Sequence, residues 1–166
     1  MKSVNIIGAG KLGKTLGRLI ATGSYAEIQA VCNRTINSSI SAAEFIQQGV
    51  AISDISKLPQ ADITLISVPD DKIYETAKKL SITNNIKKGS VIFHCSGSLS
   101  SSELTSLKTK GCGVASIHPM HSFACPDRSI NNFVGTYCAI EGDIPQTEEL
   151  KTIFEDFGAK TYFINK

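Results

Sequence analysis

The amino-acid sequence predicts an α/β fold with a doubly wound, mostly parallel sheet and helices on both faces. Short apolar runs alternate along the chain with helical patterns, as in repeated strand–helix–strand units. The run at residues 63–68 is apolar at almost every position, which is typical of a strand covered on both faces. With 166 residues the chain has the length of one domain and can bury a sizeable core.

Strands are predicted wherever a short apolar run is bounded by turn residues. They are expected at residues 4–7, 28–32, 50–52, 63–68, 90–95, 114–117, 136–140 and 161–164. A single helical turn is expected at residues 53–58, before Pro59.

The first two helices are predicted from apolar side chains three or four residues apart and from terminal signals. The first has an inner stripe formed by Leu12, Leu16, Leu19 and Ile20, and Gly23 ends it. Ser38 and Ser39 are the expected N-cap of the second, which ends at Gly49. Its expected inner side chains are Ile40, Ala43 and Ile46.

Three further helices follow from similar signals. Asp70 is expected to cap a helix whose inner side chains are Ile73, Ala77 and Leu80. Ser100 and Glu103 form a predicted capping box that opens a helix closed by Gly111. Pro145 precedes a last helix, which Gly158 ends and whose apolar side chains are Leu150, Ile153, Phe154 and Phe157.

Composition excludes several classes of partner. Apolar residues make up 42% and charged residues 19% of the chain, and the formal net charge is +2. No basic block indicates nucleic acid, and neither a basic amphipathic helix nor an apolar run of roughly 18 residues indicates a membrane. No signal peptide is evident at the N-terminus. The partner must be inferred from the candidate sites, and these indicate a small-molecule substrate.

The five cysteines indicate a reducing compartment. Their number is odd and no CxxC pair is present, so free thiols in the cytoplasm are expected. His94, Cys95, His118, His121 and Cys125 match no common spacing of zinc ligands, so no metal is expected.

The segment from residue 8 to residue 13 is the most informative motif. It reads Gly8, Ala9, Gly10, Lys11, Leu12 and Gly13, which is GxGxxG between a strand and a helix. Gly8 permits the tight turn, Gly10 lets the backbone approach a pyrophosphate, and Gly13 lets the helix pack closely. The helix N-terminus then offers N–H groups to the phosphates. The motif predicts a dinucleotide site.

The same segment also fits the P-loop pattern through Gly8, Gly13, Lys14 and Thr15. Gly10 has no use in a P-loop, and Leu12 suits a helix facing the sheet better than a loop around phosphate. We favour the dinucleotide interpretation, under which Lys14 and Thr15 are ordinary helix residues.

The residues after the second strand indicate which cofactor is bound. NAD-specific domains carry an Asp or Glu about 20 residues past the glycines, and here Asn33 stands 20 residues past Gly13. Arg34 offers a planar guanidinium to a 2′-phosphate, and Asn33 and Thr35 offer neutral hydrogen bonds. The sequence therefore favours NADP(H) over NAD(H).

Candidate substrate-side residues follow three other strands, because ligands in open α/β sheets bind beyond the carboxyl ends of strands. Ser67, Val68 and Pro69 are expected to line the nicotinamide side, while Asp70 and Asp71 are interpreted as structural. The remaining candidates are Ser96 and Gly97 after one strand and His118 after the next.

These last candidates bear on the chemistry. The Ser96 hydroxyl is expected to face the nicotinamide or a substrate oxygen, and Gly97 allows close backbone approach. His118 is a candidate acid–base partner for a hydroxyl/carbonyl couple, because histidine is the side chain that most often serves as general acid or base. His94 and His121 are interpreted as structural hydrogen-bonding residues.

Several segments in one order carry a family resemblance. They are IIGAGKLG, VCNRT, LISVPDDKI, HCSGSLSSSEL and SIHPMHSFA. Together they resemble the Rossmann-like oxidoreductases related to prephenate dehydrogenase, and in particular a subgroup with a C-terminal helical domain of unknown function. Pyrroline-carboxylate reductase, ketopantoate reductase and deazaflavin-dependent NADP reductases look like more distant relatives.

The resemblance implies specific roles. By similarity, His118 binds the substrate hydroxyl as catalytic residue and Ser96 assists it. Residues 1–166 are implied to be the NAD(P)-binding Rossmann domain, and the helical domain that closes the substrate pocket and forms a dimer is expected to be missing from this chain. A homodimer is one candidate assembly.

Two functions remain open at this stage. One is an NADP(H)-dependent oxidoreductase domain that transfers a hydride between nicotinamide and a small hydroxy/keto or imino acid. The other is a non-catalytic NADP(H)-binding module, acting as a sensor or scaffold.

Overall fold

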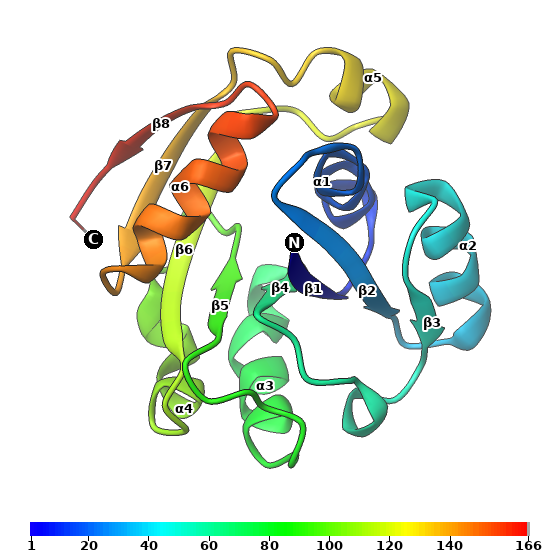
Figure 1. The fold of residues 1–166 in the computed structure, drawn as a ribbon, viewed down its shortest axis with the longest axis vertical. Helices are drawn as coiled ribbons and strands as arrows, with labels where there is room; N and C mark the ends of the chain where they lie inside the picture. Colours follow the sequence, from blue (N-terminus) through cyan, green and yellow to red (C-terminus); the bar gives the residue numbers. More distant parts are fainter. Residues whose placement is uncertain (166) are drawn as a thin grey trace.

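All strands join one sheet in the computed structural model, which describes residues 1–165 (Figure 1). The eight strands lie in the order β3-β2-β1-β4-β5-β6-β7-β8. Strands β1 to β6 are parallel, β7 runs antiparallel to β6, and β8 is parallel to β7. The bounds are β1 Lys2–Ile7, β2 Ala26–Cys32, β3 Val50–Ile52, β4 Ile63–Ile66, β5 Val91–His94, β6 Gly113–Pro119, β7 Tyr137–Gly142 and β8 Lys160–Phe163.

Helices cover the sheet on both faces, as the sequence predicts for a doubly wound fold. The α-helices are α1 Lys11–Thr22, α2 Ile36–Ile46, α3 Asp70–Ser81, α4 Thr105–Lys108, α5 Pro126–Asn131 and α6 Gln146–Asp156. Two 3₁₀ turns, η1 Ile55–Lys57 and η2 Ser101–Leu104, complete the described elements. Side chains of α1, α2 and α6 pack into one buried cluster, and those of α3 and α4 pack into the other. Within residues 1–165 no helix is long and apolar enough to cross a membrane.

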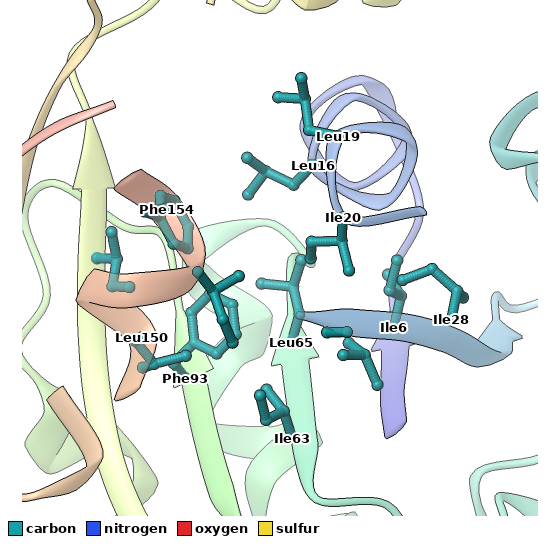
Figure 2. Close-up of a cluster of buried hydrophobic side chains, with 14 of the residues drawn as sticks. Ile6, Leu16, Leu19, Ile20, Ile28, Ile63, Leu65, Phe93, Leu150 and Phe154 are labelled. Carbon is teal, nitrogen blue, oxygen red and sulfur yellow. The ribbon is translucent and has the colours of Figure 1, made fainter. Parts of the chain in front are cut away.

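The larger core cluster shows how strand alternation fills one face. Ile6, Leu65 and Phe93 are register partners on β1, β4 and β5, so their side chains point to the same side of the sheet. Leu16 of α1 and Phe154 of α6 cover them (Figure 2). The rings of Phe93 and Phe154 meet edge to face, with centroids 6.1 Å apart. Burying each of these side chains contributes about 1.5–3 kcal/mol.

The register aligns the carboxyl ends of four strands. Ile7 of β1 pairs with both Cys32 of β2 and Ile66 of β4, and Ile66 pairs with His94 of β5. The residues that follow these ends therefore meet at one edge of the sheet. Because the chain leaves β1 for β2 on one side and places β4 on the other, this edge is the topological switch point of the fold.

The start of α2 differs from the prediction. Its N-cap is Thr35, whose side chain accepts from the Ser38 backbone N–H, so the expected Ser38/Ser39 cap is wrong. Ser39 is fully buried and Ile40 is 42% exposed. The cause is a hydrogen bond: the Ser39 hydroxyl donates to the Ile52 carbonyl. Ser39, and not Ile40, therefore faces β3.

Two other expected caps do not form. Pro69 occupies the cap position of α3, and Asp70, the first residue of the helix, makes no capping hydrogen bond. The Ser100 hydroxyl pairs with the Ser102 hydroxyl instead of capping, and the segment becomes η2 followed by the four-residue α4. Helix α5 was not expected from periodicity, because its six residues are too few to show a period.

Candidate functional site

The turn between β1 and α1 requires glycine at two positions. Gly8 has φ +89°, and a Cβ there would lie 2.6 Å from Val68 Cγ1 and 2.8 Å from the Val68 nitrogen. A Cβ on Gly13 would lie 2.5 Å from Ser67 Oγ and 2.9 Å from the Gly8 carbonyl oxygen. The positive φ of Gly8 fits its predicted role in the tight turn, and the contacts of Gly13 fit its predicted role in close packing.

Gly10 is different, because space lies open above it. A Cβ on Gly10 would meet no atom within 4 Å. Gly10 is the N-cap of α1, no side chain caps the helix, and its first turn holds no acidic residue. The amides from Lys11 to Gly13 precede the first intrahelical hydrogen bond, from Lys14 N–H to the Gly10 carbonyl. The turn therefore presents a bare, electropositive helix end to open space.

A groove of about 380 Å³ begins at this turn. One wall comes from the start of α1, the opposite wall comes from the β2–α2 connection and α2, and α5 contributes one residue. The lining residues are Ala9, Gly10, Lys11, Lys14, Asn33, Ser38, Ser41 and Pro126.

The P-loop alternative does not fit this geometry. Thr15 is 0% exposed, and its hydroxyl donates to the Lys11 carbonyl at 2.8 Å, so it cannot hold a magnesium ion. The Lys14 ammonium lies 3.4 Å from Ser41 Oγ on α2 rather than folding back over the glycine turn. Of the two interpretations of the glycine turn, the geometry therefore favours the dinucleotide site.

Asn33 links the two sides of the groove through hydrogen bonds. The Ala9 N–H donates to Asn33 Oδ1 at 2.7 Å, and Asn33 Nδ2 donates to the Ser38 carbonyl at 2.9 Å. Its amide, expected to face a 2′-phosphate, is thus bonded to the protein on both sides. Thr35 is likewise occupied as the cap of α2. Arg34 is exposed and takes part in none of the ion pairs within residues 1–165.

The segment after β4 packs against the glycine turn between β1 and α1. Ser67 Oγ donates to the Gly8 carbonyl at 2.7 Å, and Val68 lies directly against Gly8. Pro69 follows at the start of α3. Ser67 and Val68 therefore hold the glycine turn, and Pro69 directs the chain along the same edge.

Asp70 organises the loop after β5. Its carboxylate accepts from Ser96 Oγ at 2.7 Å and from Ser98 Oγ at 3.1 Å. The Ser96 oxygen also accepts the Leu99 N–H at 3.1 Å, and Ser96 is only 6% exposed. The Ser96 hydroxyl, which is expected to face the substrate, is therefore hydrogen-bonded to Asp70 and Leu99. Ser98, two residues further on, is exposed.

His118 packs flat against this loop. A Cβ on Gly97 would lie within 2.7–2.9 Å of three atoms of the His118 ring, so only glycine admits the ring here. His118 Nδ1 is buried and has no hydrogen-bond partner among the described residues. The structure thus brings Ser96, Gly97 and His118 together beside Asp70.

The other two histidines are engaged within the protein. His94 is 0% exposed, its Nδ1 accepts from the Ser96 N–H at 3.1 Å, and its Nε2 contacts the Ser100 carbonyl at 3.0 Å. His121 packs against Phe123 and Phe133, with ring centroids 5.1 and 5.8 Å away. Both match the structural interpretation.

Thiols beside the site are weakly acidic. Burial, and then the negative field of Asp54, raises the pKa of Cys32 to about 11, and burial also raises the pKa of Cys95. Neither supplies a thiolate near neutral pH. No cluster of His, Cys, Asp or Glu within residues 1–165 is arranged to hold a metal.

Sequence reasoning missed five residues of this edge. The sequence predicts Asp70 as a helix cap and Lys14 as an ordinary helix residue. Ser41 and Pro126 carry no local signal, because only the approach of α2 and α5 to α1 places them at the groove. Ser98 had a signal in the serine-rich stretch that follows His94.

Solved structures of several oxidoreductases share this fold. A proposed NADP oxidoreductase from Bacteroides fragilis is 20% identical, with a TM-score of 0.80 over 99% of this chain and 61% of that one. Prephenate dehydrogenase from Aquifex aeolicus is 20% identical, with a TM-score of 0.78 over 99% and 62%. It has also been solved with hydroxyphenyl propionate and NAD+.

A more distant match has the same architecture. The 1-pyrroline-5-carboxylate reductase of Streptococcus pyogenes is 14% identical, with a TM-score of 0.70 over 99% of this chain and 58% of that one. This chain spans about three fifths of the length of the structures it resembles. At these identities the likeness concerns the fold.

No curated protein matches the sequence. The sequence profile of the Rossmann-like domain does match, over residues 1–119, and the chain belongs to this Rossmann-like family.

Proposed function

We propose that this chain binds NADP(H) and forms the cofactor-binding part of a dehydrogenase or reductase. The observation that carries the proposal is the glycine turn: open space above Gly10 meets the uncapped N-terminus of α1. That combination accepts a pyrophosphate, since the backbone comes close and the helix end is electropositive.

Most of the predicted cofactor-binding residues have a place in this proposal. In the segment Gly8 to Gly13, the amides of Lys11 to Gly13 bind the pyrophosphate, Gly10 lets it approach the backbone, and Ala9 is held in position by Asn33. Arg34, at the exposed end of β2, meets the 2′-phosphate, and position 33 carries no carboxylate to repel it. Ser67, Val68 and Pro69 border the nicotinamide side.

The chemistry we propose is hydride transfer to or from a small hydroxy/keto or imino acid. The nicotinamide, when bound, exchanges the hydride with the substrate carbon. His118 accepts the proton of a substrate hydroxyl as it becomes a carbonyl, or returns it in the reverse direction. Ser96 and Asp70 keep Gly97 against the His118 ring and so position it.

Replacing Gly10 by valine tests the dinucleotide site. We expect Gly10→Val to abolish NADPH binding, because its side chain fills the space that a pyrophosphate needs. The fold should be unaffected, since a Cβ at Gly10 meets no atom within 4 Å. Binding is measured by fluorescence titration and stability by thermal melting.

Thr152→Val serves as the control, because it places the same side chain on the exposed face of α6. It should leave NADPH binding unchanged.

Titrations with NADPH, NADH and ATP on the unmodified chain decide between ligand classes. ATP binding without dinucleotide binding, or full NADPH binding by Gly10→Val, would refute the proposal. A turnover screen with NADPH and carbonyl or imine substrates separates an enzyme from a non-catalytic binding module.

A further inference from the structure

Lys14 is a cation that the dinucleotide motif does not use. The motif assigns the pyrophosphate to backbone amides around Gly10, one helical turn before Lys14. Yet Lys14 lines the groove together with Ser38 and Ser41 of the β2–α2 side. Its place in the wall of the groove therefore distinguishes Lys14 from an ordinary surface lysine.

The side chain of Lys14 points across the groove rather than along the glycine turn. Its ammonium lies 3.4 Å from Ser41 Oγ and 5.7 Å from the centroid of the Phe45 ring, both on α2. No carboxylate neutralises it, since none of the ion pairs within the described residues involves Lys14. The charge therefore stands on the side of the groove that follows β2.

That side has fewer donors than the sequence suggests. The Asn33 amide is bonded to Ala9 and Ser38, and the Thr35 hydroxyl is bonded to Ser38. Arg34 and Lys14 are then cationic side chains on this side that make no ion pair with the described residues. A phosphate placed over the start of α2 needs such partners, because its charge must be balanced.

We propose that Lys14 binds the 2′-phosphate of NADP(H) and is a determinant of NADP(H) over NAD(H) preference. This inference rests on the proposed dinucleotide function. Lys14 supplies the charge from the α1 wall, Arg34 supplies it from the β2 end, and the Ser41 hydroxyl orients the ammonium. The pyrophosphate is held separately by the turn around Gly10.

Substitution of Lys14 by methionine tests this role, because methionine keeps the length and packing of the chain while removing the charge. We expect Lys14→Met to raise the Kd for NADPH about tenfold or more, and to change the Kd for NADH by less than about twofold. Lys14→Arg retains a cation and should restore most of the NADPH affinity. Lys110→Met, an exposed lysine at the opposite end of the sheet, is the matched control and should change neither Kd.

Each other result has a defined meaning. Equal weakening of NADPH and NADH by Lys14→Met would overturn the inference, because it would place Lys14 at the pyrophosphate or in the packing of α1 on α2. Unchanged NADPH affinity, or an unmodified chain that binds both dinucleotides equally well, would also overturn it while leaving a dinucleotide site intact. If the unmodified chain binds neither dinucleotide, the proposed function itself fails.

Discussion

At the scale of single residues, several polar side chains at the strand ends make hydrogen bonds within the protein and do not face a ligand with their polar atoms free. Asn33 joins the glycine turn to the start of α2, and Ser96 is tied to Asp70 and the Leu99 amide. Buried polar groups must find hydrogen-bond partners in the folded chain. A sequence pattern identifies such a residue as belonging to the site, but it does not tell which partner takes its hydrogen bonds.

Asp70 provides a test of this view. We expect Asp70→Ala to lower the free energy of unfolding by about 1 kcal/mol, because the nearly buried Ser96 hydroxyl loses its acceptor. Asp71→Ala is the matched control: it also lies in the first turn of α3, but its side chain is 75% exposed. Its effect should stay within about 0.5 kcal/mol. Urea titration measures both, and equal losses would show that Asp70 acts only on the helix dipole.

At the scale of elements, apolar periodicity identified the strands and the longer helices, whereas their ends depend on contacts from elsewhere. Residues 63–68 were predicted as one strand, but β4 ends at Ile66 because Ser67 and Val68 turn to support Gly8. The inner face of α2 rotated toward Ser39 because of a carbonyl on β3. Both shifts come from hydrogen bonds between segments far apart in the chain.

Asp62 joins elements in a way that makes stability depend on pH. The Lys87 ammonium and then the Ser3 backbone N–H hold the pKa of Asp62 at about 2, below its ordinary value of 3.8. Because the folded-state pKa is depressed, the carboxylate stabilises the fold fully above the unfolded-state pKa. The stabilisation is lost as pH falls from about 4 toward 2.

We expect this contribution to be about 1–2 kcal/mol, since Asp62 is 23% exposed and partly screened by solvent. Urea unfolding across that pH range should show a smaller decline for Asp62→Asn than for the unmodified chain. Asp127→Asn, on the short helix α5, is the control and should keep the original slope. An unchanged slope in Asp62→Asn would contradict the assignment.

At the scale of the whole molecule, the strand direction reverses between β6 and β7, and no local sequence pattern predicts this reversal. Strand β7 runs antiparallel to β6, pairing His118 with Ala139, and β8 then follows β7 in the same direction. Helix α6 packs on the same face as α1, which completes the cluster around Phe93 and Phe154 (Figure 2). The β6–β7 pairing also holds the strand end that carries His118.

The distribution of thiols tests this packing as a whole. All five cysteines are free, and burial raises the pKa of Cys32, of Cys112 and of Cys138, the last to about 12. Because the thiolate is the reactive form, we expect a disulfide reagent at about pH 8 to label Cys125 first and the buried thiols only after unfolding. Cys125→Ser should remove the fast phase. Rapid labelling of several thiols in the native protein would contradict the described core.

The sequence alone determined the fold class and the place of the candidate site. Strand–helix alternation predicted the doubly wound sheet, and three glycines between a strand and a helix located the turn that we propose binds the pyrophosphate, because each of these signals is local and depends on backbone geometry. Gly8 adopts the positive φ of a tight turn, and Gly13 has the close contacts that its position in the motif suggested.

Only the tertiary structure decided which side chains face the groove. Lys14, Ser41 and Pro126 reach it because α1, α2 and α5 pack together, and Asp70 reaches Ser96 because the loops after β4 and β5 are neighbours. Their sequence separations carry no period or motif. Side-chain contacts between distant segments arise from how apolar faces pack, and that information is not contained in any one stretch of the chain.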